Sequence, residues 1–300
     1  MNFLDKYENG SWTIESEIRK DSFGAVYKIS KDVDGVKSFS ALRALFLPLS
    51  SFLGDFSLQG IKWESMPECL GKIVDGYLQS LKFIDKLKGA ANIVSYEDCR
   101  ALEMEDEIGY VIVFRMELLD RLEDVIAEKD LGEMDAVKLG LDICGALEAI
   151  EETQPLIIEP DSIMISKQGD YKLGRLELDG DCLLWEGRTF AIDDRYLAPN
   201  RLASEDRVLF NLYSLGLVMY QITNGKLLPF MPPANEIVSP FIRREAIERR
   251  LSGEKLPPPS NASKELADII LKACAYNEKE RYQSVAEMKN ALLEYMSGKI

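Results

Sequence analysis

The sequence predicts an α+β protein of two lobes, in which a small N-terminal antiparallel β lobe with one helix precedes a mainly α-helical C-terminal lobe. The first third of the chain holds short apolar or alternating segments between turns, as half-buried strands do. Within it, residues 68–88 repeat apolar side chains every three or four positions, which predicts one amphipathic helix. After about residue 120 this helical spacing dominates.

The elements of the first lobe follow from local patterns. Residues 25–29 and 110–114 are apolar runs of strand length, and residues 38–42 alternate polar and apolar side chains. The helix over residues 68–88 presents its apolar positions on one face, and Gly89 ends it.

The second lobe is predicted to combine helices with a short β pair. Residues 163–165 and 171–173 are strand-like and flank a turn. Residues 209–223 are apolar on nearly all sides, which is typical of a buried helix. Ser284 followed by Glu287 has the form of a capping box, so a last helix begins there. One more helix is marked by apolar residues that step by three and four: Met134, Val137, Leu141, Cys144 and Leu147.

The composition excludes several classes of function. The 300 residues include no histidine, so no imidazole base and no histidine-containing metal site is available. Lysine and arginine number 36 against 51 aspartates and glutamates, and the formal net charge of −15 argues against a general nucleic-acid binder. The five cysteines form no CxxC motif, and their number is odd, so we expect unpaired thiols in a reducing compartment.

The chain carries no sign of a leader or a membrane segment. Its first residues lack a basic stretch followed by an apolar run, as a signal peptide would have. The longest apolar runs, such as residues 110–114, fall far short of the ~20 residues of a membrane helix. We therefore expect a cytoplasmic protein without a membrane span.

Eight motifs, in order along the chain, resemble those of the protein kinase family. The glycine-rich loop resembles residues 18–27, the third-strand Ala-x-Lys residues 41–43, the segment after the αC helix residues 92–94, and the hinge residues 115–119. The strands around the catalytic and metal loops resemble residues 163–165 with 171–174, and the end of the activation segment resembles residues 196–199. The start of the αF helix resembles residues 211–216, and the closing motif resembles residues 281–284. Any one motif is a weak signal, whereas eight in the right order are specific. The sequence of these motifs is most similar to that of bacterial Ser/Thr kinases of the Firmicutes type.

The resemblance implies a single domain over residues 1–300 with a bilobal protein kinase-like fold. Its N-terminal lobe, with the αC helix, would span residues 1–115, its hinge 116–121 and its C-terminal lobe 122–300. The match itself covers residues 12–296.

The resemblance also places the nucleotide cleft of the family. In the glycine-rich loop, Arg19 and Asp21 replace two glycines, and Asp21 adds negative charge where a triphosphate would lie. We therefore expect a vestigial cleft without a cofactor. Its residues would be Ile18, Gly24, Val26, Ala41, Arg43, Met116, Glu117 and Leu119.

The ion pair that organises an active kinase is missing on this alignment. Arg43 stands for the third-strand lysine, and arginine keeps the charge without the compact ammonium group. Ser80 stands for the glutamate of the αC helix. We favour the interpretation that Arg43 is a structural cation that pairs elsewhere or reaches solvent.

The catalytic and metal loops depart from the family as well. Ile157 stands for the catalytic aspartate, and an isoleucine can accept no proton. Glu159 and Ser162 replace the lysine and the asparagine of the same loop. Arg175 replaces the metal-binding aspartate, and its charge would repel Mg²⁺, so we expect no metal site.

Two of these replacements exchange charges. Glu159 stands where the family has a lysine, and Arg175 stands where it has an aspartate. We predict that Glu159 or Glu177 forms an ion pair with Arg175 or Arg43. The alternative is four independent surface charges, since charged side chains are mostly exposed.

Two scaffold positions are altered in a milder way. Asn211 replaces the αF aspartate but keeps an amide oxygen that can accept a hydrogen bond. Asn200 replaces the glutamate that pairs with Arg281 in the family, so we expect Arg281 to bind carbonyl oxygens instead.

From these losses we expect a catalytically inactive member of the family, a pseudokinase that is not an enzyme and binds no Mg-ATP. It would regulate or scaffold a protein partner, for example an active kinase, through the αC face, residues 241–244 or residues 175–200. Two alternatives are a metal-independent nucleotide or anion sensor, in which Arg43 and Arg175 hold a phosphate, and a non-kinase transferase on the same scaffold.

Overall fold

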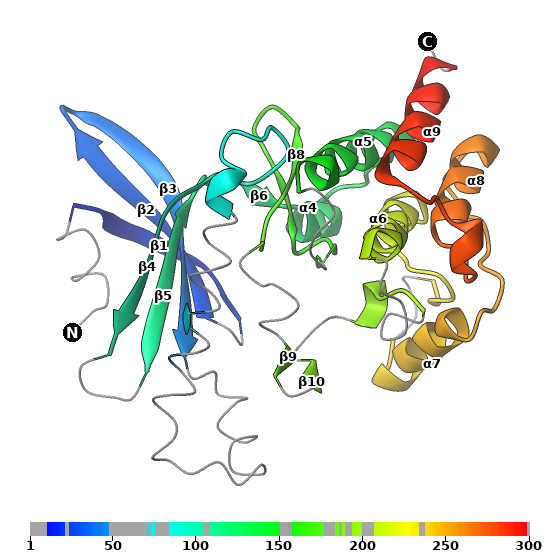
Figure 1. The fold of residues 1–300 in the computed structure, drawn as a ribbon, viewed down its shortest axis with the longest axis horizontal. Helices are drawn as coiled ribbons and strands as arrows, with labels where there is room; N and C mark the ends of the chain where they lie inside the picture. The colour runs from blue at the N-terminus through cyan, green and yellow to red at the C-terminus, as the bar shows by residue number, and fades with distance from the viewer. Residues whose placement is uncertain are drawn as a thin grey trace, which may run out of the picture. The chain divides into compact units, whose positions relative to one another are not determined.

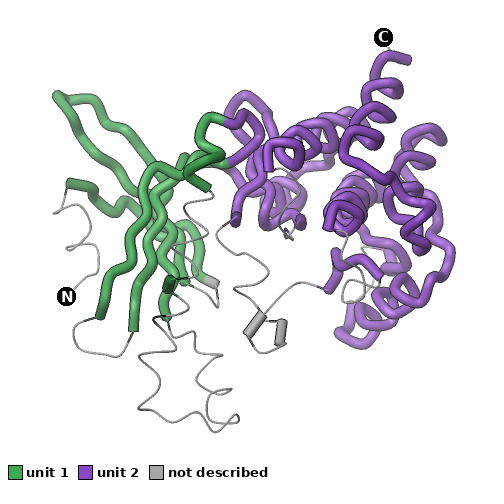
Figure 2. The backbone as a smooth tube through the Cα atoms, viewed as in Figure 1, with its two compact units in different colours: residues 1–89, 94–119 green, residues 90–93, 120–300 purple. Residues whose placement is uncertain are grey.

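Figure 1 shows the computed structural model of the chain. It describes residues 11–21, 24–47, 71, 74–75, 84–104, 109–150, 156, 158–176, 184–185, 188–189, 194–199, 207–233 and 238–298. The chain divides into two compact units, coloured in Figure 2. Unit 1 comprises residues 1–89 and 94–119, and unit 2 comprises residues 90–93 and 120–300.

Unit 1 contains a five-stranded antiparallel sheet in the order β1-β2-β3-β5-β4. The strands are β1 (Thr13–Asp21), β2 (Gly24–Val33), β3 (Val36–Leu47), β4 (Tyr96–Glu103) and β5 (Tyr110–Met116). The three strands predicted for this lobe are therefore confirmed, and each extends beyond its predicted run. Most of the helix predicted over residues 68–88 lies outside the described residues. Three of its apolar side chains are described and buried: Val74, Ile84 and Leu87.

The β2–β3 hairpin is fixed by its turn and by its apolar face. Asp34 and Gly35 both adopt positive φ, of 54° and 79°, which suits the tight turns that join twisted antiparallel strands. One face of the sheet buries Ile29, Leu42, Ala44, Val111 and Val113. The closest backbone approach is at the start of β2, where a Cβ on Gly24 would lie 1.9 Å from the carbonyl oxygen of Ala44. The strand pairing by itself thus requires glycine at position 24.

Unit 2 is mainly helical, as the sequence predicts. Its helices are α4 (Leu122–Glu128), α5 (Glu133–Ala149), α6 (Arg207–Thr223), α7 (Pro240–Leu251), α8 (Lys264–Ala273) and α9 (Val285–Ser297), with the 3-10 turns η3 (Asp194–Tyr196) and η4 (Glu278–Glu280). A small antiparallel sheet joins β6 (Asp120–Arg121), β7 (Ile163–Ile165) and β8 (Tyr171–Leu173). Two further strands, β9 (Leu184–Trp185) and β10 (Arg188–Thr189), pair with each other.

Helix α6 is the centre of unit 2, and α5, α8 and α9 pack against it. It is buried over nearly its whole circumference, as its strongly apolar sequence predicts. The contacts are close because glycines replace side chains at the crossings. A Cβ on Gly216 would lie 2.8 Å from both Ala273 Cβ and Cys274 Sγ. A Cβ on Gly140 of α5 would lie 2.7 Å from a methyl group of Leu292.

The predicted cap of α9 is confirmed in part. Ser284 accepts a hydrogen bond from the backbone N–H of Glu287 at 3.1 Å, as the motif requires. The Glu287 carboxylate accepts from the backbone N–H of Gln283, one residue before the cap. The described cysteines, Cys99, Cys144 and Cys274, form no disulfide, as the sequence predicts. No helix among the described residues is long and apolar enough to cross a membrane.

Substitution of Gly216 by valine is expected to destabilise unit 2. The added side chain has no room between α6 and α8, and overpacking of this kind costs about 1–3 kcal/mol. The free energy of unfolding, from denaturant titration followed by circular dichroism, measures this loss. Gly298→Ala is the control, because a Cβ there meets only backbone oxygens at 3.7 Å. Equal stability of the two variants would contradict the close α6–α8 contact.

Candidate functional site

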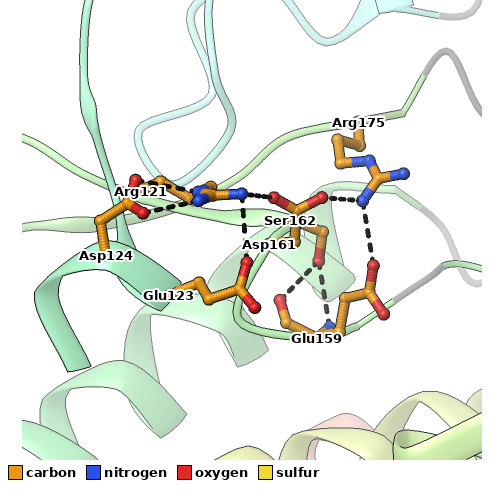
Figure 3. A network of polar contacts seen from close by, with 7 residues as sticks. All are labelled: Arg121, Glu123, Asp124, Glu159, Asp161, Ser162 and Arg175. Atoms are coloured by element: carbon orange, nitrogen blue, oxygen red, sulfur yellow. Dashed lines mark hydrogen bonds and ion pairs between the residues drawn. The ribbon is translucent and has the colours of Figure 1, made fainter. Parts of the chain in front are cut away.

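A network of charged side chains lies where β6, the turn before β7 and the end of β8 meet (Figure 3). Arg121 ends β6, Glu159 and Asp161 lie in the turn that precedes β7, and Arg175 follows β8. The sheet β6-β7-β8 brings these three segments together although more than 50 residues separate Arg121 from Arg175.

The guanidinium group of Arg175 is held between two carboxylates. Its Nη1 lies 3.0 Å from Glu159 Oε1 and also contacts Asp161 Oδ2. The side chains of Arg175 and Glu159 are each 10% exposed, and that of Asp161 is 21% exposed. Because water is largely excluded, these ion pairs are screened far less than surface pairs.

Asp161 is shared by two arginines, one on each carboxylate oxygen. Its Oδ1 lies 2.5 Å from Nη1 of Arg121, while its Oδ2 contacts Arg175. Arg121 is held in turn by Asp124, through two hydrogen bonds, and by Glu123 at 3.1 Å. Hydrogen bonds from Arg121 to Asp124 and to Asp161 raise the pKa of the guanidinium, against an opposing effect of burial. The orientation of the Asp161 carboxylate is therefore fixed from both sides.

The backbone of this site is held by Ser162 and is strained at Arg175. The buried hydroxyl of Ser162 donates to Glu159 O at 2.9 Å and accepts from Glu159 N at 3.1 Å. The Ser162 carbonyl accepts from Gly174 N at 2.8 Å, which ties the turn to the end of β8. Arg175 adopts φ of +56°, a left-handed conformation that costs a side-chain-bearing residue about 1–2 kcal/mol. The ion pairs of Arg175 offset this strain.

The network combines proton-accepting and proton-donating groups. Two arginines meet four carboxylates, those of Glu123, Asp124, Glu159 and Asp161, so the formal charge of the network is negative. The Nε of Arg175 is buried and donates no hydrogen bond. Asp161, whose side chain is 21% exposed, offers a carboxylate of fixed orientation.

The residues of this site do not fit a magnesium ion. The described residues contain no group of three or more aspartate, glutamate, cysteine or histidine side chains that could hold a metal. Arg175 occupies the carboxylate oxygens of Glu159 and Asp161, and a guanidinium group repels a divalent cation.

The predicted ion pair across the exchanged positions is confirmed for one of its combinations, Glu159 with Arg175. The alternative of independent surface charges is wrong for these two residues, since both are largely buried. Ile157 and Glu177 lie outside the described residues. Asp161 and Arg121 also belong to the network, although the sequence pattern does not identify them. The spacing of Glu159 and Asp161 is the signal for Asp161, because residues two positions apart in an extended turn can face the same way.

The two scaffold predictions are confirmed. The Oδ1 of Asn211 accepts a long hydrogen bond of 3.4 Å from the backbone N–H of Leu156. Arg281, which is 1% exposed, donates from Nε to the Ala275 carbonyl at 2.7 Å and from Nη2 to the Tyr276 carbonyl at 3.1 Å. Burial lowers the pKa of Arg281. Asn200, which stands for the family glutamate, lies outside the described residues.

The candidate nucleotide-site residues of unit 1 lie along its sheet. Arg43 on β3 pairs in register with Val26 on β2, and Ala41 on β3 pairs with Met116 on β5. Arg43 is 2% exposed, so the suggestion that it reaches solvent is wrong. Ile18 on β1 is 52% exposed.

The other described positions predicted for that site are Gly24, Glu117 and Leu119. Glu117, just after β5, accepts a hydrogen bond from the backbone N–H of Ser95 at 2.7 Å. Gly24 is buried in the sheet, and Leu119 is partly buried. Ser80 lies outside the described residues.

With this fold and site, the comparisons with known proteins define the family. The family model of the protein kinase domain matches residues 68–293. Because the match covers about three quarters of the 300 residues, the chain belongs to the protein kinase family. The α+β fold, with an antiparallel sheet before a helical unit, is that of a bilobal protein kinase.

Three relatives place the chain within this family. The serine/threonine-protein kinase PknB of Mycolicibacterium smegmatis is 26% identical over 226 residues, which cover 71% of this chain and 34% of the relative. The probable serine/threonine-protein kinase CPE1738 of Clostridium perfringens is 24% identical over 61% of this chain and 27% of the relative. The MAP kinase kinase MKK1/SSP32 of Saccharomyces cerevisiae is 30% identical over 34% of this chain and 20% of the relative. The matched part is thus about a third of each relative or less.

These comparisons overturn the prediction of an inactive protein that is not an enzyme. The chain belongs to the protein kinase family, and its relatives carry the names of kinases. The alternatives of an anion sensor and of a non-kinase transferase fall with that prediction. The prediction rested on the combined loss of the catalytic aspartate, the metal-binding aspartate and the lysine–glutamate ion pair at their aligned positions. The segment that carries Ile157 also holds two carboxylates, those of Glu159 and Asp161.

Removing the charge of Arg175 alone is expected to destabilise unit 2 more than removing the charges of Arg175 and Glu159 together. Arg175→Met leaves a largely buried Glu159 carboxylate without this cation, whereas Arg175→Met with Glu159→Gln leaves neither charge. A double-mutant cycle on the free energy of unfolding should give a coupling of about 1–3 kcal/mol. Additive losses would contradict the buried ion pair.

Proposed function

We propose that the chain is a phosphotransferase that moves the terminal phosphate of a nucleoside triphosphate to a serine or threonine hydroxyl of a protein. The support is its membership of the protein kinase family and the names of its bacterial relatives, which are serine/threonine kinases. We further propose that it belongs with the bacterial serine/threonine kinases and that its protein partner is the phosphate acceptor.

The single observation that carries the proposed chemistry is the position of Asp161 between two arginines. In phosphoryl transfer the protein acts mainly by positioning and by electrostatic stabilisation, with one carboxylate that orients the acceptor hydroxyl. Asp161 lies in the turn before β7, four residues after Ile157. Its carboxylate is oriented by Arg121 and Arg175 and remains 21% exposed at its side chain. We assign to it the role of accepting the proton of the acceptor hydroxyl.

Arg175 supplies the positive charge in this proposal. The charge of its guanidinium group stabilises the transferred phosphoryl group, on which negative charge accumulates in the transition state. The oxygen of the acceptor forms a bond to the terminal phosphorus, the bond from that phosphorus to the nucleoside diphosphate breaks, and the acceptor proton passes to Asp161. Glu159 keeps Arg175 in place through the ion pair at 3.0 Å.

Asp161→Asn is expected to abolish most of the transfer. The amide keeps the shape of the side chain but cannot accept the proton, and loss of general-base catalysis lowers rates by about 10²–10⁴-fold. The measurement is transfer of labelled terminal phosphate from ATP or GTP to serine- and threonine-containing peptides and to the chain itself, with Mg²⁺, with Mn²⁺ and with a chelator.

Lys289→Gln is the matched control, because it removes an exposed ion pair to Glu148 on the α5–α9 surface. Circular dichroism of each variant separates loss of transfer from loss of fold. The proposal fails if the folded chain labels no acceptor under any of the three metal conditions. It also fails if Asp161→Asn transfers phosphate as fast as the unchanged chain.

A further inference from the structure

A small cavity lies in unit 2 between the turn η3, the end of α6, the loop that follows α6, and α7. Its volume is about 90 Å³. This is several times the ~10–15 Å³ that a cavity needs in order to hold one water. It is far below the ~300–1,000 Å³ of sites for drug-sized ligands. The cavity therefore has room for a single small group, such as one phosphate, and not for a nucleotide.

The polar lining of this cavity is basic. Four of its side chains are cations, those of Arg195, Lys226, Arg243 and Arg250, and none of its lining residues is an aspartate or a glutamate. The chain as a whole carries a formal charge of −15, so a cluster of one sign against that background is unusual. Cations that line a cavity with low-dielectric walls focus a positive potential into it.

Arg250 forms a fixed cationic wall of the cavity. It is 3% exposed and donates to the carbonyl oxygens of Leu197, Asp194 and Arg195, at 2.5, 2.9 and 3.1 Å, and to the Tyr213 hydroxyl at 3.0 Å. All four of these acceptors are uncharged oxygens. A buried charge that is hydrogen-bonded but not neutralised by these partners attracts an anion strongly.

Two other cations of the lining can adjust to a ligand. Arg243 is exposed near the start of α7, and its guanidinium group forms no hydrogen bond or ion pair with the residues that the structure describes. Arg195 lies in η3, is partly exposed, and its guanidinium carbon lies 5.7 Å from the centre of the Tyr196 ring. Both are long side chains whose guanidinium groups can turn toward a group in the cavity.

The other polar residues of the lining are already engaged. Lys226 lies 3.0 Å from Asp130, but that carboxylate is 95% exposed, so the pair is largely screened by solvent. Gln221 accepts from the Tyr196 hydroxyl at 2.6 Å and donates to the Lys226 carbonyl at 3.2 Å. These contacts hold the walls of the cavity in place without placing a buried anion in it.

We propose that this cavity binds a phosphate monoester group, carried by a phosphoserine or phosphothreonine of a protein segment. A tetrahedral dianion matches the size of the cavity and its positive potential. Planar guanidinium groups hydrogen-bond phosphate oxygens in pairs, which favours phosphate over a singly charged carboxylate. The site shares no residue with the network around Arg175, so it stands independently of the proposed phosphotransferase activity.

Binding of the 300-residue chain to three probes tests this inference. The probes are inorganic phosphate, a short phosphoserine peptide and the same peptide without the phosphate, each titrated at constant ionic strength and followed by calorimetry and by the shift in melting temperature. We expect saturable binding of the phosphopeptide and none of its unphosphorylated form. Tighter binding of the phosphopeptide than of inorganic phosphate identifies a protein segment as the source. Equal binding retains the phosphate site but overturns the assignment to a protein segment.

Arg243→Gln and Arg195→Gln locate the binding in this cavity, and we expect each to weaken phosphopeptide binding by about tenfold. Arg244→Gln is the matched control, because Arg244 is the exposed neighbour on the same helix but lies outside the lining. It should leave binding unchanged. The inference is overturned if the phosphopeptide does not bind, or if Arg244→Gln weakens binding as much as Arg243→Gln.

Discussion

The carboxylates of Glu159 and Asp161 share a single guanidinium group, that of Arg175, and the local structure of the site depends on this interaction. Arg175 has a left-handed backbone, with φ of +56°, and its side chain is 10% exposed. Without its two partners, such a residue would combine backbone strain with a desolvated charge. The ion pairs connect the end of β8 to the turn before β7, and Arg121 extends the connection to β6. Three segments that are distant in sequence are thereby held in one arrangement.

The rest of unit 2 provides a rigid support for this network. Helix α6 is buried on nearly all sides, and its Asn211 contacts the backbone at Leu156, just before the turn that carries Glu159. The same helix ends at the basic cavity, where Gln221 and Arg250 are held by carbonyl and hydroxyl groups. One apolar helix thus positions both an ion-paired carboxylate site and a cationic cavity.

The sequence was sufficient for most of the fold because periodicity reports burial directly. The alternation of residues 38–42 and the apolar run of residues 209–223 each identified their element, and the exchange of charge at Glu159 and Arg175 predicted their ion pair. It was not sufficient for Asp161 and Arg121, because their contact depends on how β6 pairs with β7. Nor does sequence reveal that Arg250 is buried with uncharged partners, since a surface helix accommodates arginine equally well.

Exchange of the two charges tests most directly whether Glu159 and Arg175 act as one unit. Glu159→Arg alone places two guanidinium groups together, and Arg175→Glu alone places three carboxylates together. The combined exchange restores one opposite-charge pair at the same two positions. Free energies of unfolding of the three variants, measured by denaturant titration, give the result. We expect the double variant to be more stable, by at least about 1.5 kcal/mol, than the sum of the two single losses implies. A double variant as unstable as that sum would contradict it.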